Sequence, residues 1–308
     1  MRARTWSWFK REMMEQATAC IETRIPLLNA VADARLNFGR GMTLRAVTAD
    51  EASRWAGDEH VRDVVPHRVL SHIAWVLEVE HGRRSIEELE YDFMAFFGSA
   101  SLLAGREVEA SFSEEWIVCA GGYERMMHGS IKIFPLNLPV SSAPPLQGPV
   151  QLHGLSDGIA AAMPRFRSAT SSSRIFHFAL SRWLYAQNAG RRSAEDAVLD
   201  LSIALEAIFT GRGENLPAAK AMRERIAVFW CGTRSGKDPR RMRDAVHDAY
   251  DVRSLIAHGE VVEGARLDSA RRTLDTVLRE TLLDFAGGGL QDFKPAKLWV
   301  PLDENERH

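Results

Sequence analysis

An arginine and a histidine lie five positions apart in the segment YDVRSLIAHGE, residues 250–260. Arginine is always charged and presents a planar fork of donors that matches a phosphate. Histidine is the side chain that gains and loses a proton near neutral pH. RNA carries its own nucleophile, the 2′-hydroxyl, so its cleavage needs only proton transfer and a positive charge on the phosphorane. Arg253 and His258 are therefore the predicted catalytic pair, with arginine as the charge and histidine as the proton carrier.

The spacing of apolar residues predicts that this segment is a helix. Val252, Leu255 and Ile256 recur three or four positions apart, as in the buried stripe of an amphipathic helix. Gly259 is a natural helix terminator. His258 therefore falls in the last turn, where the helix dipole favours the protonated imidazole.

The neighbours of the pair are predicted to support it. Ser254 precedes His258 by one helical turn, so its hydroxyl can hydrogen-bond and orient the imidazole. Asp251 shares the face of Ser254 and His258, and with Tyr250 it is assigned a supporting role. Arg253 lies about 140° around an ideal helix from His258. The two side chains can still reach one cleft in two ways. The long Arg253 side chain can curl along the helix surface, or a partner molecule can complete the cleft.

Two segments of the chain resemble a known family. LDLSIALEAIFTG, a long helical interval and then YDVRSLIAHGE are similar to the HEPN domain, specifically its Apea-like branch, over roughly residues 155–288 and most strongly over 198–260. The resemblance implies an all-α bundle that commonly dimerises and carries an Arg-x4–6-His motif, which Arg253 and His258 match with four residues between them. In active members, the motifs of two protomers form a metal-independent endoribonuclease site, and many members act as toxins or in prokaryotic defence against phage. Glu206 matches a recurrent acidic position of the branch, which implies a supporting role.

The sequence departs from the family pattern at one position. The residue after the motif arginine is often Asn, Asp or His in strongly nucleolytic members, and here it is Ser254. A hydroxyl can orient the imidazole, but it carries no charge and does not titrate near neutral pH.

Basic residues cluster just before the motif. Between residues 220 and 243 they outnumber acidic ones by eight to two, and the loop TRSGKDPRRMR leads directly into the motif helix. Such a patch suits the phosphate backbone of a nucleic acid, although a solvated loop of an arginine-rich protein fits the same pattern. The predicted RNA-binding residues are Arg234, Lys237, Arg240, Arg241 and Arg243.

Composition bounds the class of protein. The chain has 308 residues, 45% hydrophobic and 26% charged, with a formal net charge of −2, which is typical of a globular protein and excludes disordered and membrane-spanning classes. The basic N-terminus is interrupted by charges at residues 10–15, so we expect an ordinary amphipathic start. Three distant cysteines predict buried thiols in a reducing cytoplasm. The histidines and cysteines show no metal-binding spacing, so neither a metal nor another cofactor is expected.

The pattern along the chain predicts an α+β protein whose two halves differ. Residues 1–150 form a mixed α/β sensing or regulatory domain. Within it, residues 10–36 suggest one or two helices, residues 72–82, 116–122 and 129–138 suggest strands, and residues 85–97 suit a helix or an amphipathic strand. Proline and glycine in 138–149 mark the boundary. Residues 151–290 read as short-looped helices of an all-α HEPN-like bundle, and 291–308 as a tail.

These observations lead to two expectations about function. The first is a cytoplasmic, homodimeric HEPN endoribonuclease that cuts single-stranded RNA by 2′-hydroxyl attack, with an antitoxin or trigger molecule as a further partner and no membrane. The second is a non-catalytic HEPN dimerisation or ligand-binding module of a defence or regulatory protein. In that module Arg253 pairs with Asp251 or with a carboxylate across the interface.

Overall fold

The computed structural model describes residues 19–59, 61, 73–82, 85–106, 108, 110, 114–119, 124–126, 149–187, 193–210, 218–233 and 238–287. Several expectations lie outside these residues. They are the amphipathic N-terminal start, the strand at 129–138, nearly all of the proline-rich segment 138–149, and the tail 291–308.

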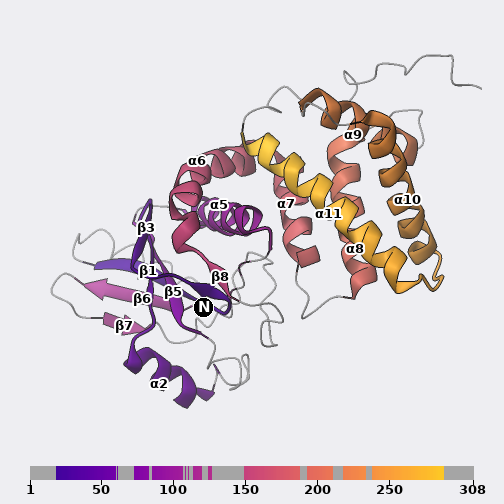
Figure 1. Cartoon of the computed structure of the whole chain (residues 1–308). Helices are drawn as coiled ribbons and strands as arrows, with labels where there is room; N and C mark the ends of the chain where they lie inside the picture. The colour runs from indigo at the N-terminus through magenta and orange to yellow at the C-terminus, as the bar shows by residue number, and fades with distance from the viewer. Residues whose placement is uncertain are drawn as a thin grey trace, which may run out of the picture. The chain divides into compact units, whose positions relative to one another are not determined.

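The chain divides into two compact units, Met1–Arg167 and Ser168–His308. The first contains a small, largely antiparallel sheet with helices, and the second is helical throughout its described part, which is the α+β layout predicted from the sequence (Figure 1). The strand β8 (Val150–Gln151) follows the predicted boundary and pairs in parallel with β2 (Ala30–Val31) in the first unit. Helix α6 (Ser156–Ser172), preceded by the 3-10 turn η1 (His153–Leu155), begins in the first unit and ends in the second.

The N-terminal unit is built on a six-stranded sheet of order β3-β4-β5-β1-β6-β7. All of its neighbouring strands run antiparallel; a central pairing sets Ile25 of β1 opposite Leu77 of β5. The strands are β1 (Ala19–Leu27), β3 (Leu36–Gly39), β4 (Met42–Ala46), β5 (Trp75–Glu80), β6 (Glu114–Cys119) and β7 (Glu124–Met126). The strands expected within 72–82 and 116–122 are thus present.

The helices expected in residues 10–36 are wrong for the described part, residues 19–36. That part forms β1, β2 and the start of β3. Residues 23–27 of β1 are all buried, Arg24 included, so both faces of this strand are covered and it shows no alternation of buried and exposed residues. β1 lies between β5 and β6, so its backbone is paired on both sides. Those partners are remote in sequence, so the local apolar run alone did not reveal the strand.

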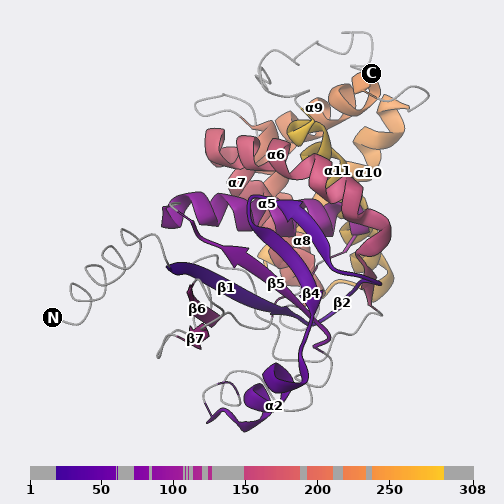
Figure 2. The same ribbon diagram turned by 90° about the vertical axis from the view of Figure 1, so that its left-hand side faces the viewer.

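Helix α5 (Ile86–Ala104) covers one face of the sheet (Figure 2). The segment that suited either a helix or a strand is helical because Ser85 and Glu88 form a capping box at its start. Its phenylalanines supply the packing: the rings of Phe96 and Phe38 lie edge to face, with centroids 5.1 Å apart. The buried Asp92 on α5 forms an ion pair with Arg40 Nε at 2.9 Å and accepts a hydrogen bond from Arg167 Nε at 2.7 Å, so it ties the β3–β4 turn and α6 to this helix.

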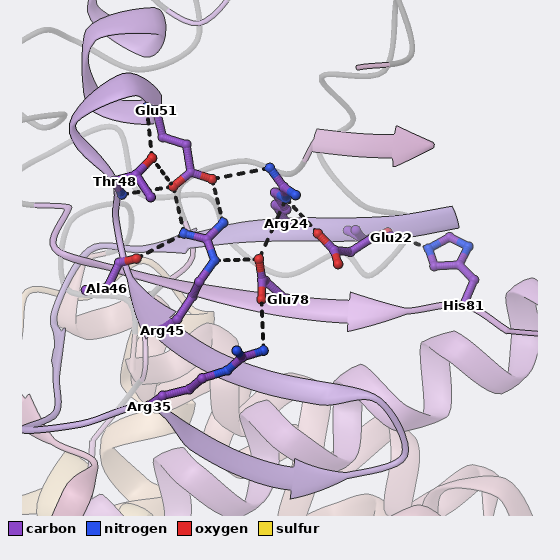
Figure 3. Close-up of polar contacts among 10 residues, drawn as sticks. Glu22, Arg24, Arg35, Arg45, Ala46, Thr48, Glu51, Glu78 and His81 are labelled. Carbon is purple, nitrogen blue, oxygen red and sulfur yellow. Dashed lines mark hydrogen bonds and ion pairs between the residues drawn. The ribbon is translucent and has the colours of Figure 1, made fainter. Parts of the chain in front are cut away.

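The other face of the sheet carries a network of ion pairs (Figure 3). Leu77 and Val79 are buried on the α5 side, so Glu78 between them projects to the opposite side. There Arg45 donates from Nε to Glu78 at 2.5 Å and from its two terminal nitrogens to Glu51 at 2.7 and 2.6 Å. Glu51 belongs to α2 (Ala49–Gly57), whose N-cap Thr48 forms a capping box with it. Strand and helix are thereby joined through one guanidinium.

Hydrogen bonds within this network shift the pKa values of its members. Burial alone raises the pKa of Glu51, but hydrogen bonds from Arg45 and Thr48 outweigh it and lower this pKa to about 2. Likewise, burial alone lowers the pKa of Arg45, while its hydrogen bonds to Glu51 and Glu78 raise it above the ordinary value. Arg24 adds a longer contact, 3.5 Å from Nη1 to Glu51. Both shifts favour the charged forms of Glu51 and Arg45.

The C-terminal unit is a bundle around α8 (Ala194–Phe209), which packs against every other helix wholly within it. Ser193 caps α8 by accepting from Asp196 N at 3.1 Å, and Val198, Leu201, Leu205 and Ile208 form its buried stripe, as their spacing predicts. The other helices are α7 (Arg174–Gln187), α9 (Ala218–Thr233), α10 (Pro239–Ala257) and α11 (Gly264–Ala286). Among the described residues, none of the helices combines the length and apolarity of a membrane span.

Candidate functional site

Three of the residues named from the sequence come together between α8 and α10. The Tyr250 hydroxyl donates to Glu206 Oε1 at 2.7 Å. The same oxygen lies 3.5 Å from Arg253 Nη2. The Arg253 guanidinium carbon also lies 5.2 Å from the centroid of the Tyr250 ring, within the range of a cation–π contact. We call Glu206, Tyr250 and Arg253 the arginine cluster.

Helical geometry explains why these side chains meet. Tyr250 and Arg253 are three positions apart on α10, so they are neighbours on one helix surface. Val252 and Ala249 are buried and fix that surface against the bundle. Glu206 lies in the last turn of α8, a helix that packs on α10. The sequence resemblance implied a supporting role for Glu206. In the structure its carboxylate contacts the Arg253 guanidinium.

The tyrosine in the cluster is held in its protonated form. Burial raises the pKa of Tyr250, and the hydrogen bond to the Glu206 carboxylate and the charge of that group raise it further, while Arg253 opposes the shift; the result is about 12. The hydroxyl therefore stays a hydrogen-bond donor toward Glu206.

The arginine in the cluster has few contacts among the described residues. There its Nε is buried and has no hydrogen-bond partner. Within the described part of the chain, its one ion pair is the 3.5 Å contact with Glu206, which is longer than a good hydrogen bond. The arginine side chain is 28% exposed and that of Glu206 22%, so solvent reaches both. Buried groups without partners are uncommon in folded proteins and call for an explanation.

His258 ends α10 and is exposed. It is the C-cap residue, and Gly259 follows with φ +77°, the left-handed conformation that glycine adopts freely. The Gly259 N–H donates to Ile256 O at 2.9 Å and the Glu260 N–H donates to Leu255 O at 3.0 Å, which closes the helix end. The imidazole thus lies in the place that the glycine predicted.

The other predicted supporting residues do not join the arginine cluster. Asp251 is exposed and pairs with His247 Nδ1 at 3.6 Å, one turn earlier on α10, and not with Arg253. Ser254 is half-buried, and in the described part of the chain no hydrogen bond connects its hydroxyl with the His258 ring. The orienting role of Ser254 therefore stays a prediction.

The apolar stripe of the motif helix is only partly covered. Val252 is buried, whereas Leu255 and Ile256 are half-buried. Val261, in the short loop that follows His258, is 100% exposed. The end of α10 that carries the imidazole thus presents apolar surface to solvent.

The basic segment is less uniform than its sequence suggests. Arg240 and Arg241 are exposed in the first turn of α10, where Asp238 caps the helix, and Arg243 is half-buried, 3.6 Å from Asp244. Arg234 and Lys237 lie outside the described residues.

Arg225 of the same segment is a core residue. It is buried and donates from Nη1 to the carbonyl of Phe209 at 2.9 Å, at the end of α8. It lies on the stripe of Met222, Ile226 and Phe229, which are all buried. That spacing was visible in the sequence and marks Arg225 as unsuited to RNA binding.

Among the described residues, no group of three or more His, Cys, Asp or Glu side chains is placed to hold a metal ion. No family model matches the chain, and no curated protein or solved structure matches it at a significant level.

Proposed function

We propose that this protein is a HEPN-type, metal-independent endoribonuclease that cleaves single-stranded RNA and leaves a 2′,3′-cyclic phosphate. Arg253 stabilises the negative charge of the phosphorane, and His258 transfers protons to or from the reacting oxygens. Ser254 orients the imidazole when RNA is bound. The protein acts in the cytoplasm, in prokaryotic defence or as a toxin, under the control of a trigger molecule or an antitoxin.

The arginine cluster is the observation that carries the proposal. Glu206 and Tyr250 flank the Arg253 guanidinium, and among the described residues its Nε has no hydrogen-bond partner. A positioned positive charge is what stabilisation of a phosphorane requires. An exposed histidine at the end of the same helix supplies an imidazole, the side chain most often used as a general acid or base.

A homodimer through the helical unit completes the site in this proposal. Arg253 and His258 do not project from the same side of an ideal helix, so the arginine of one copy and the histidine of the other act together. The half-buried Leu255 and Ile256 and the exposed Val261 surround His258 in the sequence, and burial of such apolar surface stabilises an interface. The exposed Arg240 and Arg241, with Arg234, Lys237 and Arg243, bind the RNA backbone.

The alternative is a non-catalytic module, and one observation favours it. Arg253 already has a carboxylate partner and an aromatic platform within its own chain, which is also the arrangement of a structural arginine. In that case Glu206 takes the part that was expected of Asp251 or of a partner's carboxylate.

Cleavage assays separate the two proposals. We expect the purified full-length protein to cut a fluorescently labelled single-stranded RNA in the presence of EDTA. Arg253→Ala and His258→Ala should each slow cleavage by about 10²-fold or more. His247→Ala is the matched control, because His247 is another exposed histidine of α10, and it should cleave at the wild-type rate. Equal cleavage by all four proteins, or its loss with EDTA, contradicts the proposed chemistry, and no cleavage by the wild type favours the module.

A further inference from the structure

The Glu206 carboxylate already occupies an anion position on Arg253. Its Oε1 is shared by two donors, the Tyr250 hydroxyl at 2.7 Å and Arg253 Nη2 at 3.5 Å. The shorter contact is a good hydrogen bond and the longer one is an ion pair without hydrogen-bond length. Glu206 is thus anchored by Tyr250 and only loosely held by Arg253.

A phosphodiester can replace this carboxylate without new chemistry. A guanidinium binds carboxylates and phosphates through the same fork of N–H donors. Arg253 and Glu206 are each between a fifth and a third exposed, so an incoming phosphate reaches the arginine without unfolding of the helices. At that degree of exposure, water screens the ion pair and keeps it weak.

We propose that Glu206 is an internal competitor for the RNA phosphate on Arg253, so that substrate binding exchanges a carboxylate for a phosphodiester. Tyr250 retains the displaced carboxylate through its hydroxyl hydrogen bond. This inference rests on the proposed function, because it assigns the substrate's scissile phosphate to Arg253. The exchange also selects among anions. An anion that binds Arg253 more weakly than Glu206 does leaves the Glu206 contact in place.

The exchange makes opposite predictions for two conservative variants. Glu206→Gln keeps an oxygen that accepts from Tyr250 but removes the negative charge, so the phosphate meets no competitor. Tyr250→Phe keeps the aromatic platform but removes the hydroxyl that shares Oε1, so the carboxylate turns wholly to Arg253. The first variant should bind RNA more tightly than the wild type and the second more weakly.

The test measures binding of an RNA-like substrate to the full chain. Binding is thereby measured separately from cleavage. The probe is a fluorescent single-stranded oligonucleotide with 2′-deoxy sugars, which has no 2′-hydroxyl to attack. Fluorescence anisotropy at low salt should show about two- to fivefold tighter binding for Glu206→Gln, the range expected for removal of one partly exposed charge contact. In Arg253→Ala the Glu206→Gln change should have no further effect, because the competitor acts only through Arg253. Thermal melting of each variant checks that the bundle is folded.

The outcomes distinguish failure of the exchange from failure of the proposed function. Unchanged binding in Glu206→Gln, with weaker binding in Arg253→Ala, overturns the exchange and leaves the role of Arg253 standing. Wild-type binding and cleavage in Arg253→Ala overturn both. If Glu206→Gln fails to fold, Tyr250→Phe decides: weaker binding supports the exchange, and unchanged or tighter binding overturns it.

Discussion

Arg45 in the N-terminal unit and Arg253 in the C-terminal unit are both paired with a glutamate, but their environments differ. Arg45 makes a bidentate contact with Glu51, donates to Glu78 and also donates to the carbonyl of Ala46, so most of its N–H donors have acceptors. Arg253 has, within the described part of the chain, one ion pair of 3.5 Å and no hydrogen bond from its Nε. A guanidinium with most donors engaged is a structural link, whereas one with a single long ion pair can still bind an anion through its exposed nitrogens.

The difference also concerns where the partners come from. Glu51 and Glu78 approach Arg45 from a helix and from a neighbouring strand, and together they enclose it. Glu206 reaches Arg253 from a single helix, and the other contact is a flat aromatic ring. The first arrangement resists rearrangement, and the second allows one partner to be exchanged. The four predictions that follow test this contrast through stability, from the largest expected effect to the smallest.

Glu51→Ala should give the largest loss of stability. It removes the bidentate partner of Arg45, which keeps Glu78, and the 3.5 Å contact of Arg24, which keeps Glu22, in a place where the Glu51 and Arg24 side chains are only 4% and 6% exposed. Breaking such a buried pair costs about 3–5 kcal/mol in the free energy of unfolding. Urea unfolding followed by tryptophan fluorescence measures it. Asp50→Ala is the control, since Asp50 is exposed beside it on α2 and should cost less than about 1 kcal/mol; similar losses for both variants contradict the structural role of the network.

Acid should weaken the same network. The pKa of Glu51 is lowered from 4.5 to about 2 in the folded protein, so its contribution to stability is present above pH 4.5 and is lost as the pH falls toward 2. The free energy of unfolding of the wild type should decrease through this window more steeply than that of Glu51→Gln, which has no carboxyl there. If the free energies of unfolding of the two proteins fall equally with pH, protonation of Glu51 is not the cause of the acid destabilisation.

Asp92→Ala should have an intermediate effect. Asp92 is buried, but its partners Arg40 and Arg167 are 45% and 25% exposed and can be hydrated after the loss of the carboxylate. We expect a loss of about 1–3 kcal/mol, the range for removing a hydrogen-bond partner of a charged group. Chemical denaturation measures it. A loss as large as that of Glu51→Ala would show that partner exposure does not set the cost.

Arg253→Ala should change stability least. The arginine gives up one partly exposed ion pair and a cation–π contact, each worth about 0.5–1 kcal/mol at most sites of this exposure. The buried Nε, which has no hydrogen-bond partner among the described residues, is removed with it. The midpoint of thermal unfolding should therefore move by a few degrees or less. A destabilisation of 3 kcal/mol or more would make Arg253 a structural arginine like Arg45 and favour the non-catalytic module.

Local patterns revealed some features of both units and missed others. The stripe of α8, its Ser193 cap and the end of α10 at Gly259 depend on spacing and on single-residue preferences, so they were predictable. The strand β1 was missed because its partners β5 and β6 are distant in the chain. The Arg45–Glu51–Glu78 network was invisible for the same reason, since no local period connects residues 45 and 78.

The arginine cluster was predicted in part. Tyr250 and Arg253 are neighbours by helical spacing, and Glu206 was named through the family resemblance, but its distance from Arg253 depends on the packing of α8 on α10. Charge counting over 220–243 misled at Arg225, because net charge does not distinguish a buried arginine from an exposed one. Helical periodicity around Arg225 does make that distinction.

The chemistry of the RNA ends tests the central claim most directly. After incubation of single-stranded RNA with the wild type in EDTA, mass spectrometry should find 2′,3′-cyclic phosphates on the upstream products, and His258→Ala should leave the RNA intact. Products with 3′-hydroxyl ends, or the same cyclic phosphates from wild type and His258→Ala, would contradict the assignment of cleavage to Arg253 and His258.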